Sequence, residues 1–188
     1  MADKNPAQAI TMIKRIEMLC DFMENPAVVK AVQDAIPFTG ITRDPGALGF
    51  DIPQWAGLGT VGIWAALDAY AERADLPRDQ CPICDRRSCI SKRFENYIGD
   101  DESDSIAELE DIRHLYAHNF GGDADAEYFR RDRHVLSSGV QRQMTCGGQF
   151  NGQQLRLDMS CLRFYSGKAQ KLLEACAASP LPAALVRR

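Results

Sequence analysis

The sequence predicts an all-α protein: a helical bundle with an N-terminal helical extension and one small β-hairpin insert. Two observations lead to the helices. Apolar residues recur at steps of three and four along several long segments. Proline, asparagine, serine and glycine, which start and stop helices, flank those segments. A third observation leads to the hairpin, because a Gly-Gly pair precedes a short stretch of alternating apolar and polar residues.

The composition fits one domain with a substantial core. The chain has 188 residues, of which 45% are hydrophobic, and this leaves room for an added N-terminal piece. Its formal net charge is −4, so no overall positive field attracts nucleic acid. A non-specific nucleic-acid coat needs many phosphate contacts and is therefore excluded. An enzyme that holds a few nucleotides in a local cationic pocket is compatible with this charge.

Residues 1–54 are predicted to form the N-terminal helical extension and a linker. Apolar spacing indicates an amphipathic helix over 6–24. Asn25-Pro26 ends that helix and starts a second, shorter one. The segment 37–54 is rich in proline and glycine, which is typical of an irregular linker. We therefore place the start of the main body at residue 55.

The main body is predicted to span 55–178, with a flexible tail at 179–188. Its first helix covers 55–74 and should be central, because its apolar stripe is wide. Three glycines near its start weaken the helix or permit the close approach of another one: Gly57, Gly59 and Gly62.

Further helices are predicted at 91–99, 105–120 and 161–177. The acidic and serine residues just before 105 are expected to cap the second of these, and Ser160 to cap the third. Apolar positions on the helix at 105–120 are expected to be buried: Ile106, Leu109, Ile112 and Leu115 or Tyr116. Before the last helix, Val140–Cys146 and Gln154–Asp158 are predicted to pair as a hairpin around Gly147-Gly148.

One stretch of the helix at 105–120 concentrates groups that can transfer protons and bind phosphate. It contains Arg113, His114, His118 and Asn119. A histidine near its usual pKa of about 6.5 can shuttle protons at neutral pH. An arginine grips the non-bridging oxygens of a phosphate with its planar fork, and a nearby amide can orient that phosphate. These residue types suit cleavage of RNA by its own 2′-hydroxyl, which requires no metal.

On a helical wheel, the arginine and the second histidine of this stretch point in different directions. Asp111, His114 and His118 share one polar side of the helix. Arg113 and His118 are about 140° apart around the axis, so one helix does not easily bring both to one phosphate. A site assembled across two facing helices solves this, and we therefore expect a homodimer.

The same stretch resembles a known family. Residues 113–118 are similar to the R-x4-6-H motif of the HEPN superfamily, with His114 as the polar residue after the arginine and Asn119 in the family's usual ending. The resemblance covers about 55–177. It implies an all-α bundle that dimerises and acts as a metal-independent endoribonuclease, a hydrolase found in toxin–antitoxin and defence systems.

By this resemblance, Arg113 stabilises the phosphate, His118 acts as base or acid, and His114 and Asn119 assist. The product would carry a 2′,3′-cyclic phosphate. One departure concerns control. A toxin subgroup has a tyrosine two residues after the motif histidine, which its antitoxin modifies, whereas this chain has Phe120. An antitoxin protein is a possible partner, but that form of control is not expected.

A different class of function is open. Arg113 can instead pair with Glu110 or another carboxylate, and the two histidines can be surface residues near a helix C-terminus. The protein would then be a non-catalytic dimerisation or regulatory module, with or without structural zinc.

The zinc hypothesis comes from the loop Cys81–Cys89. Its C-x2-C-x4-C spacing, through Cys84, forms a knuckle that can hold zinc. Cys146 or His134 is the candidate fourth ligand. Three reduced thiols are the alternative, and a redox role is a further one. The other cysteines, together with two tryptophans, are expected in the core: Cys20, Cys161, Cys176, Trp55 and Trp64.

The sequence also indicates a location. It has no run of 18 apolar residues that would form a transmembrane helix, and its first residues lack the pattern of a signal peptide. Seven cysteines without a secretion signal suggest reduced thiols. We therefore expect a cytoplasmic protein that makes no membrane contact, takes RNA as substrate and requires no cofactor for catalysis.

Overall fold

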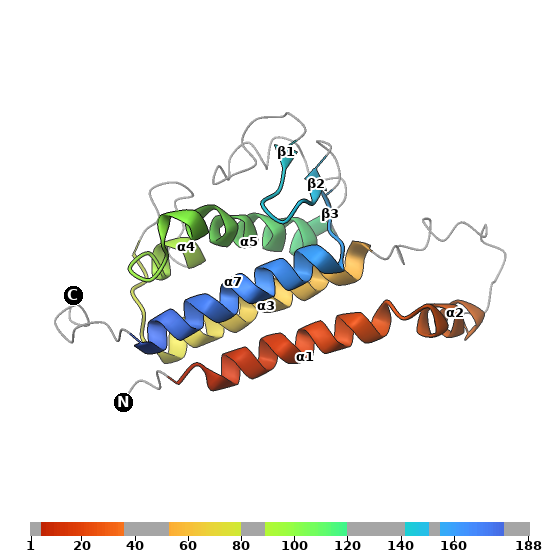
Figure 1. Ribbon diagram of the computed structural model, residues 1–188, viewed down its shortest axis with the longest axis horizontal. Helices are drawn as coiled ribbons and strands as arrows, with labels where there is room; N and C mark the ends of the chain where they lie inside the picture. Colours follow the sequence, from red (N-terminus) through yellow and green to blue (C-terminus); the bar gives the residue numbers. More distant parts are fainter. Residues whose placement is uncertain (1–4, 36–52, 80–88, 120–141, 151–154, 179–188) are drawn as a thin grey trace.

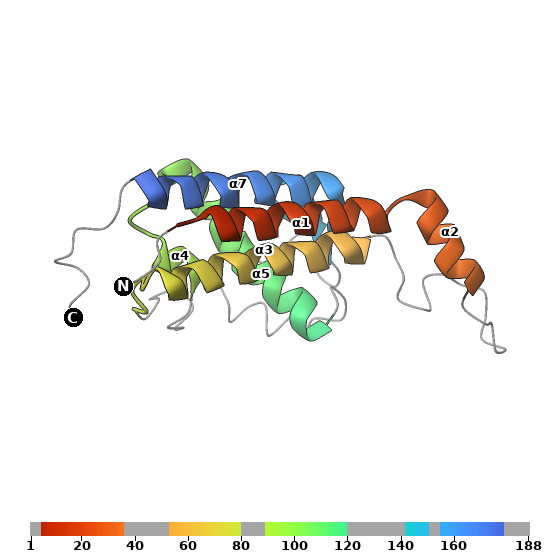
Figure 2. The ribbon, with the colours of Figure 1, turned by 90° about the horizontal axis from the view of Figure 1, so that it is seen from below.

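The computed structural model describes residues 5–35, 53–79, 89–119, 142–150 and 155–178. Most of these residues are helical, which confirms the predicted all-α class. Three long helices lie side by side: α1 (Ala7–Met23), α3 (Pro53–Arg73) and α7 (Met159–Ala178) (Figure 1). The helix α5 (Asp100–Asn119) packs on α3 and α7 and crosses them obliquely (Figure 2). No helix in the described part is long and apolar enough to span a membrane.

The core lies between these four helices. Each contributes fully buried side chains, among them Ile13, Leu67, Leu109 and Tyr165. The apolar positions expected on α5 are buried, including Tyr116. Because α1 buries Ile13 in the same core as α3 and α7, the division at residue 54 does not separate two cores.

The glycines of α3 permit close helix packing, as the sequence suggested. A Cβ atom at Gly57 would lie 2.0 Å from ring atoms of Tyr116 on α5. A Cβ atom at Gly62 would lie 2.9 Å from Ile16 on α1. A helical glycine costs about 1 kcal/mol relative to alanine. At Gly57 the absence of a side chain lets the Tyr116 ring pack directly against the α3 backbone.

The helix α2 (Pro26–Ala35) follows α1 and extends beyond the bundle (Figure 1). The Asn25 side-chain oxygen accepts a hydrogen bond from Ala27 N at 2.9 Å, which caps the helix as expected from an asparagine at that place. The prediction of two N-terminal helices is therefore confirmed.

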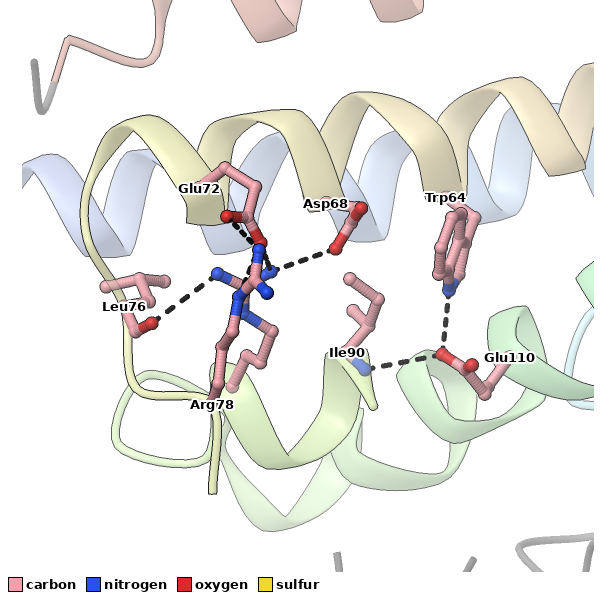
Figure 3. A network of polar contacts seen from close by, with 8 residues as sticks. Trp64, Asp68, Glu72, Leu76, Arg78, Ile90 and Glu110 are labelled. Atoms are coloured by element: carbon pink, nitrogen blue, oxygen red, sulfur yellow. Dashed lines mark hydrogen bonds and ion pairs between the residues drawn. The ribbon is translucent and has the colours of Figure 1, made fainter. Parts of the chain in front are cut away.

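The helix α4 (Ile90–Arg93) is shorter than the predicted helix at 91–99. The chain turns at 94–97 because Phe94 is fully buried and stacks on Tyr70, with ring centroids 6.2 Å apart. The buried Arg93 fixes this corner by ion pairs to Asp68 at 2.9 Å and to Glu72 at 2.5 Å (Figure 3).

Two helix starts differ from the predicted ones. The helix α5 begins at Asp100 and not at 105, so the acidic residues form its first turn, where the helix dipole favours them. The helix α7 begins at Met159, and its cap is Asp158 rather than Ser160. The Asp158 carboxylate accepts hydrogen bonds from Cys161 N and from the Ser160 hydroxyl, and these bonds lower its pKa.

A small antiparallel sheet lies beside α5. Its order is β1 (Arg142–Gln143), β2 (Gln149–Phe150), β3 (Leu155–Arg156), with Gln143 opposite Gln149 and Phe150 opposite Leu155. The predicted pairing of 140–146 with 154–158 is therefore wrong, because β2 lies between them. Period-two spacing marks a strand but does not identify its neighbour. The turn between β1 and β2 contains Gly147 at φ +90°, a value that favours glycine.

Candidate functional site

The four predicted catalytic residues all lie on the last two turns of α5. The side chains of His114, His118 and Asn119 lie outside the described part of the chain. Arg113 is therefore the site residue whose surroundings are defined. The departure from the family pattern at Phe120 also lies outside it.

Arg113 stacks on an aromatic ring of α3. Its guanidinium carbon is 4.5 Å from the centroid of the Trp64 ring, a cation–π contact. Both side chains are half-buried. The electron-rich face of the ring attracts the cation and holds it against α3.

Trp64 is itself held by a buried carboxylate. Its Nε1 donates a hydrogen bond to Glu110 Oε2 at 2.7 Å, and the same oxygen accepts one from Ile90 N at 3.3 Å (Figure 3). Glu110 is 2% exposed. One carboxylate therefore joins α3, α4 and α5 beneath the arginine.

Sequence reasoning missed the role of Trp64. It placed this tryptophan in the core, whereas the structure puts its ring under Arg113 and its N–H on Glu110. The residues come from different helices, and local spacing carries no signal that they meet. The indole N–H of a tryptophan, which usually finds a hydrogen-bond partner when it is buried, is the feature that could have pointed to an acceptor such as Glu110.

The polar side of α5 is less exposed than the helical wheel suggested. Asp111, which shares that side with the two histidines, is 2% exposed. Glu108 is 1% exposed. Glu108, Glu110 and Asp111 are thus inside the protein, and neighbouring elements supply hydrogen-bond donors to Glu108 and Glu110 that a wheel cannot show.

Glu108 serves the side of α5 that faces the sheet and α7. Its Oε2 accepts a hydrogen bond from the Tyr165 hydroxyl at 2.7 Å, and its Oε1 accepts one from Thr145 N at 3.0 Å. The Thr145 hydroxyl also donates to this carboxylate. Burial and the charge of Glu108 raise the pKa of Tyr165, so its hydroxyl stays protonated and remains a donor. Glu108 therefore anchors the β1–β2 turn and α7 to α5.

The predicted zinc ligands do not come together among the described residues. Cys81, Cys84 and His134 lie outside the described part. Cys89 is buried, and its Sγ is 3.0 Å from the Ser91 hydroxyl. Cys89 adjoins Ile90, which bonds Glu110, whereas Cys146 adjoins Thr145, which bonds Glu108. Residues 108 and 110 point about 200° apart around a helix, so the segments that carry Cys89 and Cys146 bond to different sides of α5.

Within the described ranges, no group of three or more histidine, cysteine or acidic side chains is arranged to hold a metal ion. The zinc knuckle of the 81–89 loop stays a prediction. Cys146 has a different neighbour, Cys161, which the sequence assigned to the core: their Sγ atoms are 2.6 Å apart.

The described cysteines differ in acidity. The hydrogen bond with the Cys161 sulfur and the one that the Gly148 N–H donates to the Cys146 sulfur lower the pKa of Cys146 to about 7. The same contact and burial raise the pKa of Cys161. Burial raises the pKa of Cys20 to about 11 and that of Cys176 to about 12. Only Cys146 of these four is activated toward the thiolate form.

Comparison of the chain with family models, with curated proteins and with solved structures gives no match. The case for a function therefore depends on the residues of the chain and their geometry.

Proposed function

We propose that this protein is a metal-independent endoribonuclease of the HEPN type that acts as a homodimer in a toxin or defence system. The observation that carries the proposal is the position of the Arg113 guanidinium over the Trp64 ring. A cation on the motif helix stacks on Trp64, which a buried Glu110 holds in turn. An arginine that only makes the surface polar does not require this three-residue arrangement of Arg113, Trp64 and Glu110.

The proposed chemistry uses the motif residues as the resemblance assigns them. His118, with assistance from His114, takes the proton of a ribose 2′-hydroxyl, and the 2′-oxygen attacks the adjacent phosphorus. The bond to the 5′-oxygen breaks, and that oxygen receives a proton. Arg113 stabilises the negative charge on the phosphate oxygens, and Asn119 orients the group. The products are a 2′,3′-cyclic phosphate and a 5′-hydroxyl.

The homodimer is part of the proposal because of the angle within α5. The backbone of α5 is helical through Asn119, so Arg113 and His118 lie about 140° apart around its axis. A second copy of α5 facing the first would place the arginine of one chain opposite the histidine of the other.

The test is RNA cleavage by purified wild-type protein and by Arg113→Ala and His118→Ala. Loss of the phosphate-binding cation is expected to slow cleavage by about 10²–10³-fold. Loss of the proton-transfer histidine is expected to slow it by about 10²–10⁴-fold. Both variants should keep the helical circular dichroism spectrum. The wild-type products should carry 2′,3′-cyclic phosphate ends in the presence of EDTA.

Arg163→Ala is the matched control. This arginine is exposed on α7, and its ion pair with Asp21 is on the surface. Its removal should leave cleavage unchanged. Cleavage that persists in both site variants would contradict the proposal. In cells, expression of wild-type protein should slow growth, and His118→Ala should relieve the effect.

One observation favours the second candidate, a non-catalytic dimerisation or regulatory module. The helix α1 exposes three large apolar side chains near its end: Met18 at 71%, Leu19 at 59% and Phe22 at 58%. Such a surface is typical of a protein–protein contact. A module would associate through this surface yet show no RNA cleavage and no growth defect.

A further inference from the structure

We propose that Cys146 and Cys161 form a peroxide-reactive thiol pair that closes reversibly into an intramolecular disulfide. Cys146 lies in the turn between β1 and β2, and Cys161 lies in the first turn of α7. Their Sγ atoms are 2.6 Å apart, about 0.5 Å more than the S–S bond length of about 2.05 Å. The fold holds the two sulfur atoms together before oxidation, so no backbone segment has to travel.

The two thiols have different surroundings, which assigns them different roles. Cys146 is half-buried; its thiol donates a hydrogen bond to the Cys161 sulfur, and its sulfur accepts one from Gly148 N at 3.3 Å. Cys161 is 2% exposed. An oxidant therefore reaches Cys146 first, and the buried Cys161 reacts with Cys146 in the next step.

The charged and titratable groups around the pair come from α5 and from α7 with its cap. Glu108 on α5 is bound to the Tyr165 hydroxyl of α7, and both lie close enough to Cys146 to affect its acidity. Asp158, at the start of α7, accepts a hydrogen bond from Cys161 N at 3.0 Å. The negative charges of Asp158 and of the Cys146 thiolate both favour a protonated Cys161, which can donate to that thiolate.

The oxidant is a hydroperoxide. The Cys146 thiolate attacks its terminal oxygen, the O–O bond breaks, and the alkoxide or hydroxide leaves and takes up a proton. The product is Cys146 sulfenic acid. The Cys161 sulfur then attacks the Cys146 sulfur, the S–O bond breaks, and water leaves with the proton from Cys161. Two electrons pass from the thiols to the peroxide, and a dithiol reductant restores the pair by exchange.

The test is mass spectrometry of the full chain after hydrogen peroxide treatment and alkylation of the remaining thiols. Trypsin cuts after Arg142, Arg156 and Arg163, so Cys146 and Cys161 fall on separate peptides, 143–156 and 157–163, each with one cysteine. The expected product is these two peptides joined, with a loss of two hydrogens. Dithiothreitol should separate them again.

A second readout is thermal stability. The disulfide closes a loop of 15 residues, so the oxidised protein should melt roughly 5–10 °C above the reduced protein. Cys146→Ser should abolish this difference. Cys176→Ser is the control, because its thiol is also buried on α7 and should leave the difference intact.

Two results would overturn the proposal. One is oxidation that stops at sulfinic acid on Cys146 with peptide 157–163 still alkylated. The other is a disulfide from Cys146 to a cysteine other than Cys161. The wild-type measurement needs no variant to fold. It also does not depend on RNA cleavage, so its failure and that of the proposed function are distinguishable.

Discussion

Two buried carboxylates, two residues apart on α5, serve opposite sides of that helix. Glu108 bonds Tyr165 and Thr145, and so fastens α7 and the sheet. Glu110 bonds Trp64 and Ile90, and so fastens α3 and α4. The difference lies in the aromatic partners: Tyr165 is fully buried, whereas the half-buried Trp64 carries Arg113 on its ring. One side of α5 is an anchor, and the other supports a cation that solvent reaches.

The largest effect is expected from removal of the two carboxylates. Glu108→Ala leaves the buried Tyr165 hydroxyl and the donors of Thr145 without their acceptor, which should lower the free energy of unfolding by about 3 kcal/mol. Glu110→Ala leaves the N–H groups of Trp64 and Ile90 without an acceptor and should cost about 2 kcal/mol. Urea unfolding followed by circular dichroism measures both. A greater loss of unfolding free energy for Glu110→Ala than for Glu108→Ala would contradict this ranking.

A smaller and more selective effect is expected from the aromatic partners. Tyr165→Phe and Trp64→Phe each remove one hydrogen bond to a buried carboxylate and should each cost about 1–2 kcal/mol of stability. They should differ in cleavage. Trp64→Phe gives Arg113 a weaker cation–π partner and shifts the position of its guanidinium. This variant should therefore slow cleavage by about tenfold. Tyr165→Phe should leave the rate of RNA cleavage unchanged. Equal effects of the two variants on that rate would contradict the proposed difference between the two sides of α5.

The helices could be predicted from the sequence because spacing within a segment reports which side of a helix is apolar. The buried residues Ile106, Leu109 and Ile112 follow from that spacing. The packing allowed by Gly57 could also be anticipated, because a helical glycine is costly and needs a reason.

Contacts between distant segments could not be predicted in this way. The stacking of Arg113 on Trp64 and the approach of Cys146 to Cys161 depend on how whole elements pack. The burial of Glu108 and Glu110 runs against the usual preference of carboxylates for water. It becomes favourable only when other elements bring donors, and a helical wheel holds no information about those donors.

The most direct test of a site shared between two chains is a mixing experiment with Arg113→Ala and His118→Ala protein. If each site takes its arginine from one chain and its histidine from the other, a mixed dimer has one intact site of two. Random exchange makes half of the dimers mixed, so a 1:1 mixture should recover roughly a quarter of wild-type cleavage, one half of one half. Each variant alone should cleave RNA at least about 10²-fold more slowly than the wild type. A mixture as inactive as its components, with exchange of chains demonstrated, would contradict the shared site.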